Sequence, residues 1–449
     1  MNLYLKARQA TFFALAFVAV AACGSNAYLP VAAGIGPSPK LPATETALIP
    51  TVNVAKATAW SGDAKPIAAA GLQVSAFAKN LQHPRWLYVL PNGDVLVAET
   101  NAPKRPDDSK GIRGWFMRLF MKKSGGTAPS ADRITLLRDT NGDGVADRQS
   151  VLVSGLYAPF GMTMVNGNLY VANSDALVRF PYDSAQLAIT TPGVKVVDLP
   201  AGTINHHWTK NVIASPDGRK LYVAIGSNSN AGENGEAAEQ NRARIWEVDV
   251  ATGTHRDFAT GIRNPVGMAW DESGKLWVAV NERDELGGDL VPDYMTAVQD
   301  GAFYGFPYSY FGSRVDARVK TPRPELVAKA IVPDFALGPH TASLGLASAA
   351  GSSLPAPFDH GMFVGQHGSW NRKPRSGYKV IFVPFVNGTP SASTIDVLTG
   401  FITDDGNAMG RPVGVAIDKR GALLVADDVG NTIWRVSANT TKQASTPKK

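Results

Sequence analysis

The chain repeats one short hydrophobic pattern, a polar turn followed by a strand of apolar residues. The copy at residues 215–225 reads SPDG and then LYVAI, which is typical of a buried strand that follows a tight turn. Similar units, the last of them weaker, occur at residues 91–99, 166–173, 272–282, 419–428 and 360–368. One such unit cannot bury its apolar face alone, so the array predicts units arranged around a common core. Six units predict an all-β fold, a six-bladed β-propeller.

The first residues have the pattern of an export signal. Lys6 and Arg8 precede an apolar run at 11–22 that is too short to span a bilayer. The run ends at VAAC, which resembles a bacterial lipobox, and Cys23 is the only cysteine of the chain. We predict a signal peptide over residues 1–22 and a lipid anchor at Cys23, on the periplasmic side of the bacterial cell envelope. An ordinary signal peptide with an incidental cysteine is the alternative.

The remaining chain divides by composition. Residues 23–70 are rich in Ala, Pro, Ser and Thr without periodicity, which predicts a lipidated, flexible tether. No linker interrupts residues 71–437, which favours one propeller domain. Residues 438–449 are polar and predict a disordered tail.

Charge narrows the possible partners. The formal net charge is +6, and the basic residues are dispersed, which argues against a nucleic acid partner. The basic and apolar segment 111–123 predicts either an amphipathic helix on a membrane or partner, or a helical insertion packed on the propeller rim.

The loop DTNGDGVAD has oxygen-bearing side chains at alternating positions, at Asp139, Asn141, Asp143 and Asp147. Hard oxygen ligands at this spacing can hold Ca²⁺. Ser150 occupies the position where an EF-hand loop has glutamate, so the hypothesis is a structural calcium loop. A hairpin turn rich in Asx residues is the equal alternative.

Cationic and imidazole side chains lie just outside the repeated units. Loops from several blades converge at the mouth of a propeller channel, where ligands bind. A lone histidine is commonly structural, so the convergence of several is what indicates function. The predicted site contains Arg85, His206, His207, Arg263, Asn264, His340, Thr341, His367, Arg372 and Arg411.

Residues 81–436 carry a resemblance in eight segments that occur in the same order. The segments are HPRWLYVLPNGDVLVAE, HHWTKNVIASPDGRKLYVAIGSN, GIRNPVGMAW, NERDELGGDLVPDY, FYGFPYSY, LGPHTASLGL, FVGQHGSWNR and GRPVGVAIDKRGALLVADDVGN. With them the chain resembles the soluble quinoprotein sugar dehydrogenases, and most closely their L-sorbosone dehydrogenase branch. Those enzymes use pyrroloquinoline quinone (PQQ).

The resemblance implies a cofactor site. PQQ has three carboxylates and an ortho-quinone, and Arg85, Arg263 and Arg411 could neutralise the acids. The family also implies Ca²⁺ beside the quinone, held by backbone carbonyls that fall near Glu282 and Arg283. The glucose enzymes have a Gly-Pro pair where this chain has Asn-Glu-Arg, so the metal geometry should differ.

The resemblance places the general base at His207, with His206 where the glucose enzymes have aspartate. An imidazole can take a hydroxyl proton while hydride leaves the adjacent carbon. The substrate would be a sugar of the sorbosone or aldose type. No CxxCH haem motif is present, so a separate acceptor, such as a cytochrome or a quinone, would receive the electrons.

Two other classes remain open. A calcium-dependent lactonase-type propeller would hold its ion with Glu, Asn and Asp, and would not need a set of arginines. A non-catalytic sugar-binding propeller of the cell envelope would not need His207.

Overall fold

The protein is a six-bladed β-propeller in a computed structural model that describes residues 26–47, 51–103 and 119–439. The predicted fold class is confirmed. The predicted signal peptide, Cys23 and residues 440–449 of the predicted tail lie outside the described residues, as does most of the 111–123 segment.

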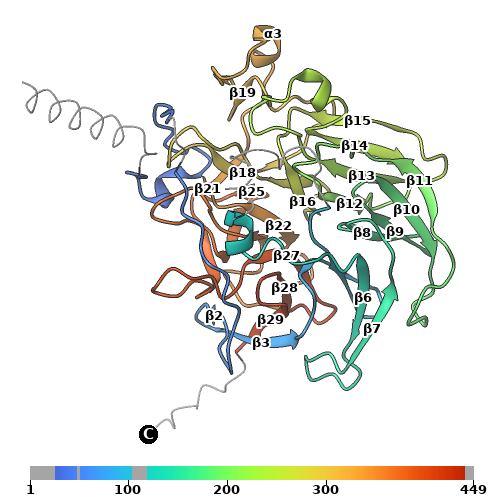
Figure 1. The fold of residues 1–449 in the computed structure, drawn as a ribbon. Coiled ribbons are helices and arrows are strands. Elements are labelled where there is room, and N and C mark those ends of the chain that lie inside the picture. The colour runs from blue at the N-terminus through green and yellow to red at the C-terminus, as the bar shows by residue number, and fades with distance from the viewer. Residues whose placement is uncertain (1–25, 48–50, 104–118, 440–449) are drawn as a thin grey trace, which may run out of the picture.

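Each blade is an antiparallel sheet of four main strands, which follow one another from the channel outwards (Figure 1). The first three blades contain β4 (Pro84–Val89), β5 (Val95–Glu99), β6 (Arg133–Arg138) and β7 (Arg148–Val153); β8 (Met162–Val165), β9 (Asn168–Ala172), β10 (Ala176–Pro181) and β11 (Val194–Asp198); and β12 (Lys210–Ala214), β13 (Lys220–Ile225), β14 (Arg244–Asp249) and β15 (His255–Thr260). The last three contain β16 (Pro265–Trp270), β17 (Leu276–Val280), β18 (Pro292–Ala297) and β21 (Phe335–Pro339); β22 (Ser343–Ser348), β23 (Gly361–Gln366), β24 (Lys379–Val386) and β26 (Ile395–Thr399); and β27 (Pro412–Ile417), β28 (Leu423–Asp427), β29 (Thr432–Ala438) and β3 (Leu72–Ala78).

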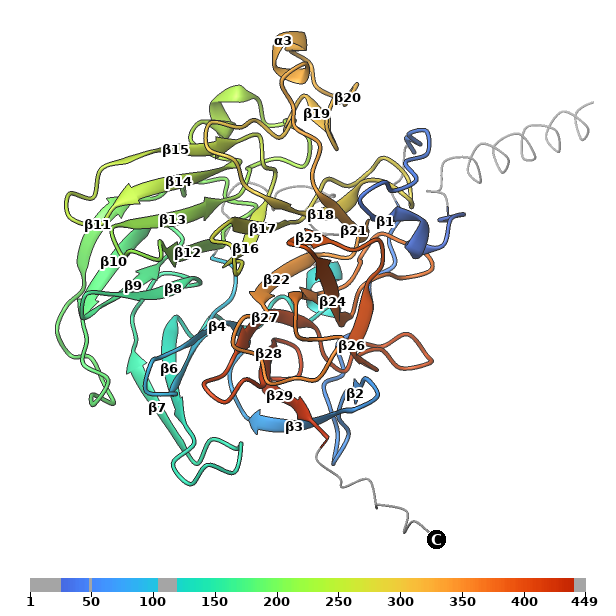
Figure 2. The same ribbon diagram turned by 180° about the vertical axis from the view of Figure 1, so that it is seen from behind.

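Short elements decorate this ring. β1 (Ile35–Gly36) and β2 (Ile67–Ala68) add to the outer edges of the fourth and fifth blades, and β25 (Thr389–Pro390) pairs with β24. A hairpin of β19 (Ser309–Tyr310) and β20 (Arg314–Val315) and the helix α3 (Pro324–Val327) form an insertion in the fourth blade, which projects from the ring in Figure 2. Two 3-10 turns, η1 (Val31–Gly34) and η2 (Glu236–Glu239), complete the described elements.

The six repeated units are the second strands of the six blades. They correspond to β5, β9, β13, β17, β23 and β28, each preceded by its turn. Every residue of β5, β17 and β28 is buried, because a second strand has neighbouring strands on both edges and neighbouring blades on both faces. This is why the units read as continuous apolar runs rather than as alternating patterns.

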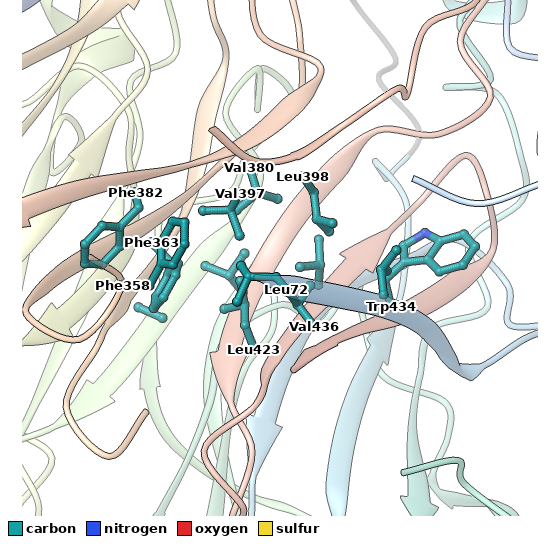
Figure 3. Close-up of a cluster of buried hydrophobic side chains, with 14 of the residues drawn as sticks. Leu72, Phe358, Phe363, Val380, Phe382, Val397, Leu398, Leu423, Trp434 and Val436 are labelled. Carbon is teal, nitrogen blue, oxygen red and sulfur yellow. The ribbon is translucent and has the colours of Figure 1, made fainter. Parts of the chain in front are cut away.

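The ring closes between its two ends in the sequence. β3 pairs with β29 over the register Leu72↔Ala438 to Ala78↔Ile433, so an N-terminal strand completes the C-terminal blade. Side chains of the fifth and sixth blades then form one buried cluster with β3, including Leu72, Phe363 and Trp434 (Figure 3). At roughly 1.5 to 3 kcal/mol for each large apolar side chain buried, such clusters are the main stabilising contribution between blades.

The inner strands approach one another closely. A Cβ added at Gly345 would lie 2.1 Å from the Val413 carbonyl oxygen, and one added at Gly161 would lie 2.3 Å from the Val212 nitrogen. Glycine therefore permits the close backbone contacts that form the narrow centre of the ring.

The expectation of a flexible tether is corrected by the structure. Described residues 26–47 and 51–70, which we call the N-terminal strap, run along the propeller towards β3 (blue in Figure 1). The backbone of Asn53 donates to the Trp370 carbonyl, and Ala57 donates to that of Lys123. The amino-acid composition did not predict this docking. The strap binds the propeller through single hydrogen bonds, and these leave no periodic pattern in the sequence.

Trp60 fixes the strap to a buried carboxylate. Its indole donates to Asp427 Oδ2 at 2.7 Å, and Trp434 donates to the same oxygen at 3.0 Å. Asp427 Oδ1 accepts the backbone N–H groups of Arg411 and Gly430, both at 2.8 Å. Burial raises the pKa of Asp427 to about 6 despite these four donors. The strap thus contacts the loop that carries Arg411.

Within the described residues, we find no helix with the length and apolarity needed to cross a bilayer.

Replacing Trp60 by Phe tests the strap. The change removes one donor from a buried carboxylate, which should lower the free energy of unfolding by about 1 to 3 kcal/mol. Chemical denaturation measures this. Ser61→Ala, at the exposed neighbouring position, should change stability by less than about 0.5 kcal/mol. Equal stability of Trp60→Phe and the wild type would contradict a docked strap.

Candidate active site

The loops at one end of the ring carry most of the predicted site residues. Inner strands begin at this end, and second strands finish there. Arg85 is the second residue of β4, and Arg411 immediately precedes β27. His367 and Asp428 immediately follow β23 and β28. We call this end the site face and the other end the opposite face.

Asp428 joins three blades at the site face. Its Oδ2 accepts a hydrogen bond from Arg85 Nη1 at 2.6 Å and lies 2.9 Å from His367 Nε2 and 3.8 Å from His83 Nε2. Burial alone would raise the pKa of Asp428, but His367, His83 and Arg85 outweigh burial and hold it well below the usual range. The carboxylate is therefore charged, with a side chain only 1% exposed.

His367 is neutral in this cluster. Burial lowers its pKa to about 4, and the charges of Arg411 and Arg85 act in the same direction, against Asp428. A neutral ring that donates from Nε2 to Asp428 keeps its lone pair on Nδ1. The positive charge of the cluster therefore comes from the two arginines and not from His367.

Several buried polar atoms at the site face have no hydrogen-bond partner among the described residues. They are Arg85 Nε, Arg411 Nε, Asn264 Oδ1, Asn371 Oδ1 and Asp428 Oδ1. Native proteins leave few such atoms unpaired, because each costs roughly 1 to 3 kcal/mol. Their concentration at one face indicates a polar ligand there.

His207 is held in one tautomer. Its Nδ1 lies 2.8 Å from the Ser227 carbonyl oxygen and 3.0 Å from Ser227 Oγ. The carbonyl can only accept, and the Ser227 hydroxyl already donates to the Ser229 carbonyl. His207 Nδ1 must therefore carry the proton, which leaves the lone pair on Nε2, as a general base requires.

Backbone contacts fix the position of His207. Lys210 is fully buried and donates to the carbonyls of His207 and Trp208 at 3.3 and 3.2 Å. Burial, reinforced by Arg242, lowers the Lys210 pKa well below its ordinary value. A Cβ added at Gly226 would lie 2.4 Å from both His207 Cβ and Asn264 Oδ1, so these two side chains flank the same glycine.

Arg85 connects the two parts of the site. Its guanidinium carbon lies 5.9 Å from the centroid of the Trp208 ring, next to His207 in the sequence, while Nη1 binds Asp428. His206 is half-buried beside His207. The Arg411 guanidinium lies 5.1 Å from the Tyr378 ring centroid. Cation–π contacts of this kind orient the guanidinium groups without using their donors.

The guanidinium donors of Arg263 are occupied by nearby backbone carbonyls and by Asn230. Its Nη1 donates to the carbonyls of Asn281 and Glu282 at 3.1 and 2.7 Å, and Nε and Nη2 donate to Asn230. The Glu282 side chain pairs with Arg283, which also binds Asp316 of the insertion. Arg263 thus organises the loop where the resemblance places the metal carbonyls.

His340 and Arg372 also have complete sets of protein partners. His340 Nδ1 is 3.0 Å from Asp284 Oδ1, and Nε2 is 2.9 Å from the Gly287 carbonyl. Burial would lower the His340 pKa, but Asp284 and the carbonyl raise it, so both ring nitrogens donate. Arg372 is fully buried and binds Asp289 and three carbonyls. Thr341 donates to Asp293 at 3.0 Å.

The Asp139 loop lies at the opposite face and closes as a turn through its own backbone. Asp139 accepts the N–H groups of Gly142 and Gly144, and Asp143 accepts that of Val145. Asp147 binds Thr140, while Asn141 accepts the Asp143 N–H. Nowhere in the described chain do three or more His, Cys, Asp or Glu side chains gather as metal ligands. The contacts favour the hairpin-turn alternative.

Asp139 also lines a cavity of about 380 Å³, far from the site described above.

Sequence reasoning did not find Asp428, Ser227 or Lys210. Asp428 and Ser227 each stand one or two residues after a second strand, the position that also holds His367. That shared position was a usable signal. Lys210 carried none, because a lysine at the start of a strand normally indicates exposure.

Comparison with known proteins gives the family. The TrAA12-like family model matches residues 127–309 and 325–439. The chain belongs to this family.

An uncharacterised protein of Borreliella burgdorferi is 29% identical over 241 residues, which cover 53% of this chain and 62% of that protein. The pyrroloquinoline quinone-dependent pyranose dehydrogenase of Coprinopsis cinerea is 44% identical over 273 residues, which cover 49% of this chain and 35% of that protein. The chain therefore spans only part of the length of each of these relatives.

Solved structures show the same fold. The holo form of the Coprinopsis cinerea pyranose dehydrogenase PQQ domain has a TM-score of 0.64 and 21% identity, covering 86% of this chain and all of that one. The calcium structure of Trichoderma reesei family AA12 has a TM-score of 0.66 and 17% identity, covering 87% and 99%.

The two histidines should differ in charge. At pH 6 we expect His340 to be an imidazolium, because Asp284 and the Gly287 carbonyl raise its pKa against the effect of burial, and His367 to be neutral, because its pKa is about 4. Proton–nitrogen NMR correlation of the imidazole rings distinguishes the states, with His340→Gln and His367→Gln for assignment. A charged His367 or a neutral His340 would contradict the described contacts.

Proposed function

We propose that this protein is a PQQ-dependent dehydrogenase that oxidises a sugar, with His207 as the general base. The observation that carries the proposal is the set of unpartnered buried polar atoms on Arg85, Arg411 and Asn264, at the same face of the ring as an imidazole in the base tautomer. The family relationship and the pyranose dehydrogenase relative support the same chemistry. A sorbosone or aldose substrate is the finer part of the proposal.

The residues present fit the cofactor. Arg85 and Arg411 each have a buried, unpaired Nε–H, and a guanidinium suits a carboxylate through paired hydrogen bonds. Arg85 shares its charge with Asp428. Among the described residues no carboxylate accepts a hydrogen bond from the Arg411 guanidinium, whose Nη2 donates only to the Ala55 carbonyl at 3.5 Å, so its remaining donors can bind an anion. Asn264 and Asn371 can satisfy further polar atoms. When bound, PQQ accepts two electrons as hydride from the substrate carbon.

His207 performs the proton chemistry in this proposal. Nε2 takes the substrate hydroxyl proton, and the resulting imidazolium is stabilised by the Ser227 carbonyl at Nδ1. Lys210 holds the backbone carbonyl of His207, so the ring keeps its position during turnover. Arg263 and His340 act indirectly, by holding the loop that follows β17.

We propose that Ca²⁺ binds at the backbone carbonyls of Glu282 and Arg283, as the resemblance implies. Carbonyl oxygen is a suitable ligand for this hard cation. The Glu282 carbonyl already accepts a hydrogen bond from Arg263 Nη1 at 2.7 Å. A carbonyl oxygen has two lone pairs, so the Glu282 carbonyl could face the cation while it keeps the Arg263 contact.

We further propose that Cys23 carries a lipid anchor in the bacterial envelope, on the periplasmic side. The electrons would pass to a separate acceptor, a cytochrome or a quinone.

Reconstitution tests the cofactor. Protein made without PQQ should be folded but inactive, and should oxidise an aldose or sorbosone with an artificial acceptor only after PQQ and Ca²⁺ are added. A chelator present during reconstitution should prevent the gain. Full activity without PQQ would contradict the proposal, and activity with PQQ and chelator would remove only the calcium requirement.

Arg411→Ala should weaken cofactor binding more than it slows chemistry. Loss of one partner of a buried charge pair costs about 2 to 5 kcal/mol, or roughly thirtyfold to several thousandfold in Kd. Titration with PQQ measures the affinity. Arg420→Ala removes an arginine from the opposite face and should leave Kd unchanged. The same Kd for Arg411→Ala and the wild type would place Arg411 outside the site.

His207→Ala should slow the reaction and spare the cofactor, because a base acts most strongly in the transition state. We expect reduction of bound PQQ by sugar to slow by a factor of about 10² to 10⁴ in rapid mixing. His206→Ala should be milder and shift mainly the pH optimum. His255→Ala, at a ring stacked on Trp246, serves as control. Reduction at the wild-type rate would exclude His207 as the base.

A further inference from the structure

The N-terminal strap begins on the site face. The backbone N–H of Ala27 donates to the Lys373 carbonyl at 2.9 Å. The N–H groups of Tyr28 and Leu29 donate to Asp289 Oδ2 at 2.8 and 3.1 Å. Lys373 lies in the loop after β23, and Asp289 lies in the loop after β17. Both loops follow second strands, so both belong to the site face.

This attachment is rigid. The side chains of Arg372 and Asp289 are 0% and 3% exposed, and Arg372 Nη2 binds both Asp289 Oδ1 and the Leu29 carbonyl. Buried charge-assisted contacts of this kind fix a backbone more firmly than surface contacts do. The first residues of the strap are therefore part of the propeller.

Chain length then limits where Cys23 can be. Ala27 follows Cys23 by four positions, and an extended chain spans at most about 3.6 Å per residue. Cys23 must lie within roughly 14 Å of this point on the site face, whatever its conformation. A flexible tether of the expected length would have allowed on the order of 40 Å, enough for any orientation.

The same region exposes side chains that suit a membrane surface. Four of the exposed large hydrophobic side chains belong to the strap or to the helical segment 119–123 that the strap contacts, namely Tyr28, Val52, Ile67 and Leu119. Lys122 and Lys123 of that helical segment are exposed as well, as is Lys56 of the strap. Anionic lipid headgroups attract lysines, while aromatic and aliphatic groups enter the interface.

We propose that the site face of the anchored protein lies against an anionic phospholipid bilayer. The inference rests on the proposed lipid anchor at Cys23, and it adds an orientation that a tether would not impose. The mouth of the site then opens towards the membrane, so reduced cofactor stands close to acceptors held in or on the bilayer.

Lysine acetylation read by mass spectrometry tests the orientation. The lipidated protein is reconstituted into vesicles containing anionic phospholipid and compared with the same protein in detergent. Lys122, Lys123 and Lys373 should react several times more slowly on vesicles. Lys275 and Lys419, exposed on opposite-face turns, should react at unchanged rates. Equal rates at all five lysines, or protection of Lys275 and Lys419 alone, would overturn the proposal.

A second experiment distinguishes an error about lipidation of Cys23 from an error about the orientation of the site face. Because Cys23 is the only thiol, the chain beginning at Cys23 can be coupled to vesicles through a maleimide lipid. Protection of the site-face lysines in this arm supports the orientation even if the cell does not acylate Cys23. Cys23→Ser shows whether acylation occurs, since the variant should not fractionate with membranes.

Charge reversal gives an independent measurement. Lys122→Glu with Lys123→Glu should lower the partition of uncoupled protein onto anionic vesicles by roughly fivefold or more for each charge removed. The matched pair Lys275→Glu and Lys419→Glu should leave partition nearly unchanged. All four positions are exposed, so both proteins should fold. An equal loss from both pairs would indicate attraction by net charge alone and would overturn a specific membrane face.

Discussion

The pairing of β3 with β29 is the constraint on which the site depends. It joins a strand from residue 72 onwards to the last blade and so places the first and sixth blades side by side. The contact between Arg85 and Asp428 crosses that junction, because Arg85 belongs to the first blade and Asp428 follows β28. Without closure, the buried carboxylate would lose its guanidinium partner, and an unpaired buried charge is strongly destabilising.

Closure also explains the electrostatics of the site face. One ionised carboxylate, Asp428, stands among Arg85, Arg411 and a neutral His367. Two guanidinium groups with unpaired, buried Nε–H donors therefore lie in this region. Such an arrangement favours an anionic ligand with several carboxylates and holds its own groups in place before the ligand arrives, which lowers the cost of binding.

The fold was predictable from sequence because its information is local. Each second strand is buried between its neighbours. The sequence of each of the six units is therefore a turn followed by a continuous run of apolar residues. The placing of His207 and Arg411 at one end of the ring was also predictable, since both lie in loops at the ends of inner strands. The different roles of the individual arginines were not predictable from the sequence. Arg263 and Arg411 look alike in sequence, and only the carbonyls opposite Arg263 show that its donors are occupied. The strap was missed for the same reason, because single contacts such as that of Trp60 with Asp427 depend on residues hundreds of positions away.

A crystal structure of the protein grown with PQQ and Ca²⁺ tests the central claim most directly. We expect density for the cofactor at the site face, with a carboxylate within hydrogen-bond distance of the Arg411 guanidinium and the quinone beside Asn264 and His207. Density only at the opposite face, or a cofactor that leaves Arg411 Nε and Asn264 Oδ1 without partners, would contradict it.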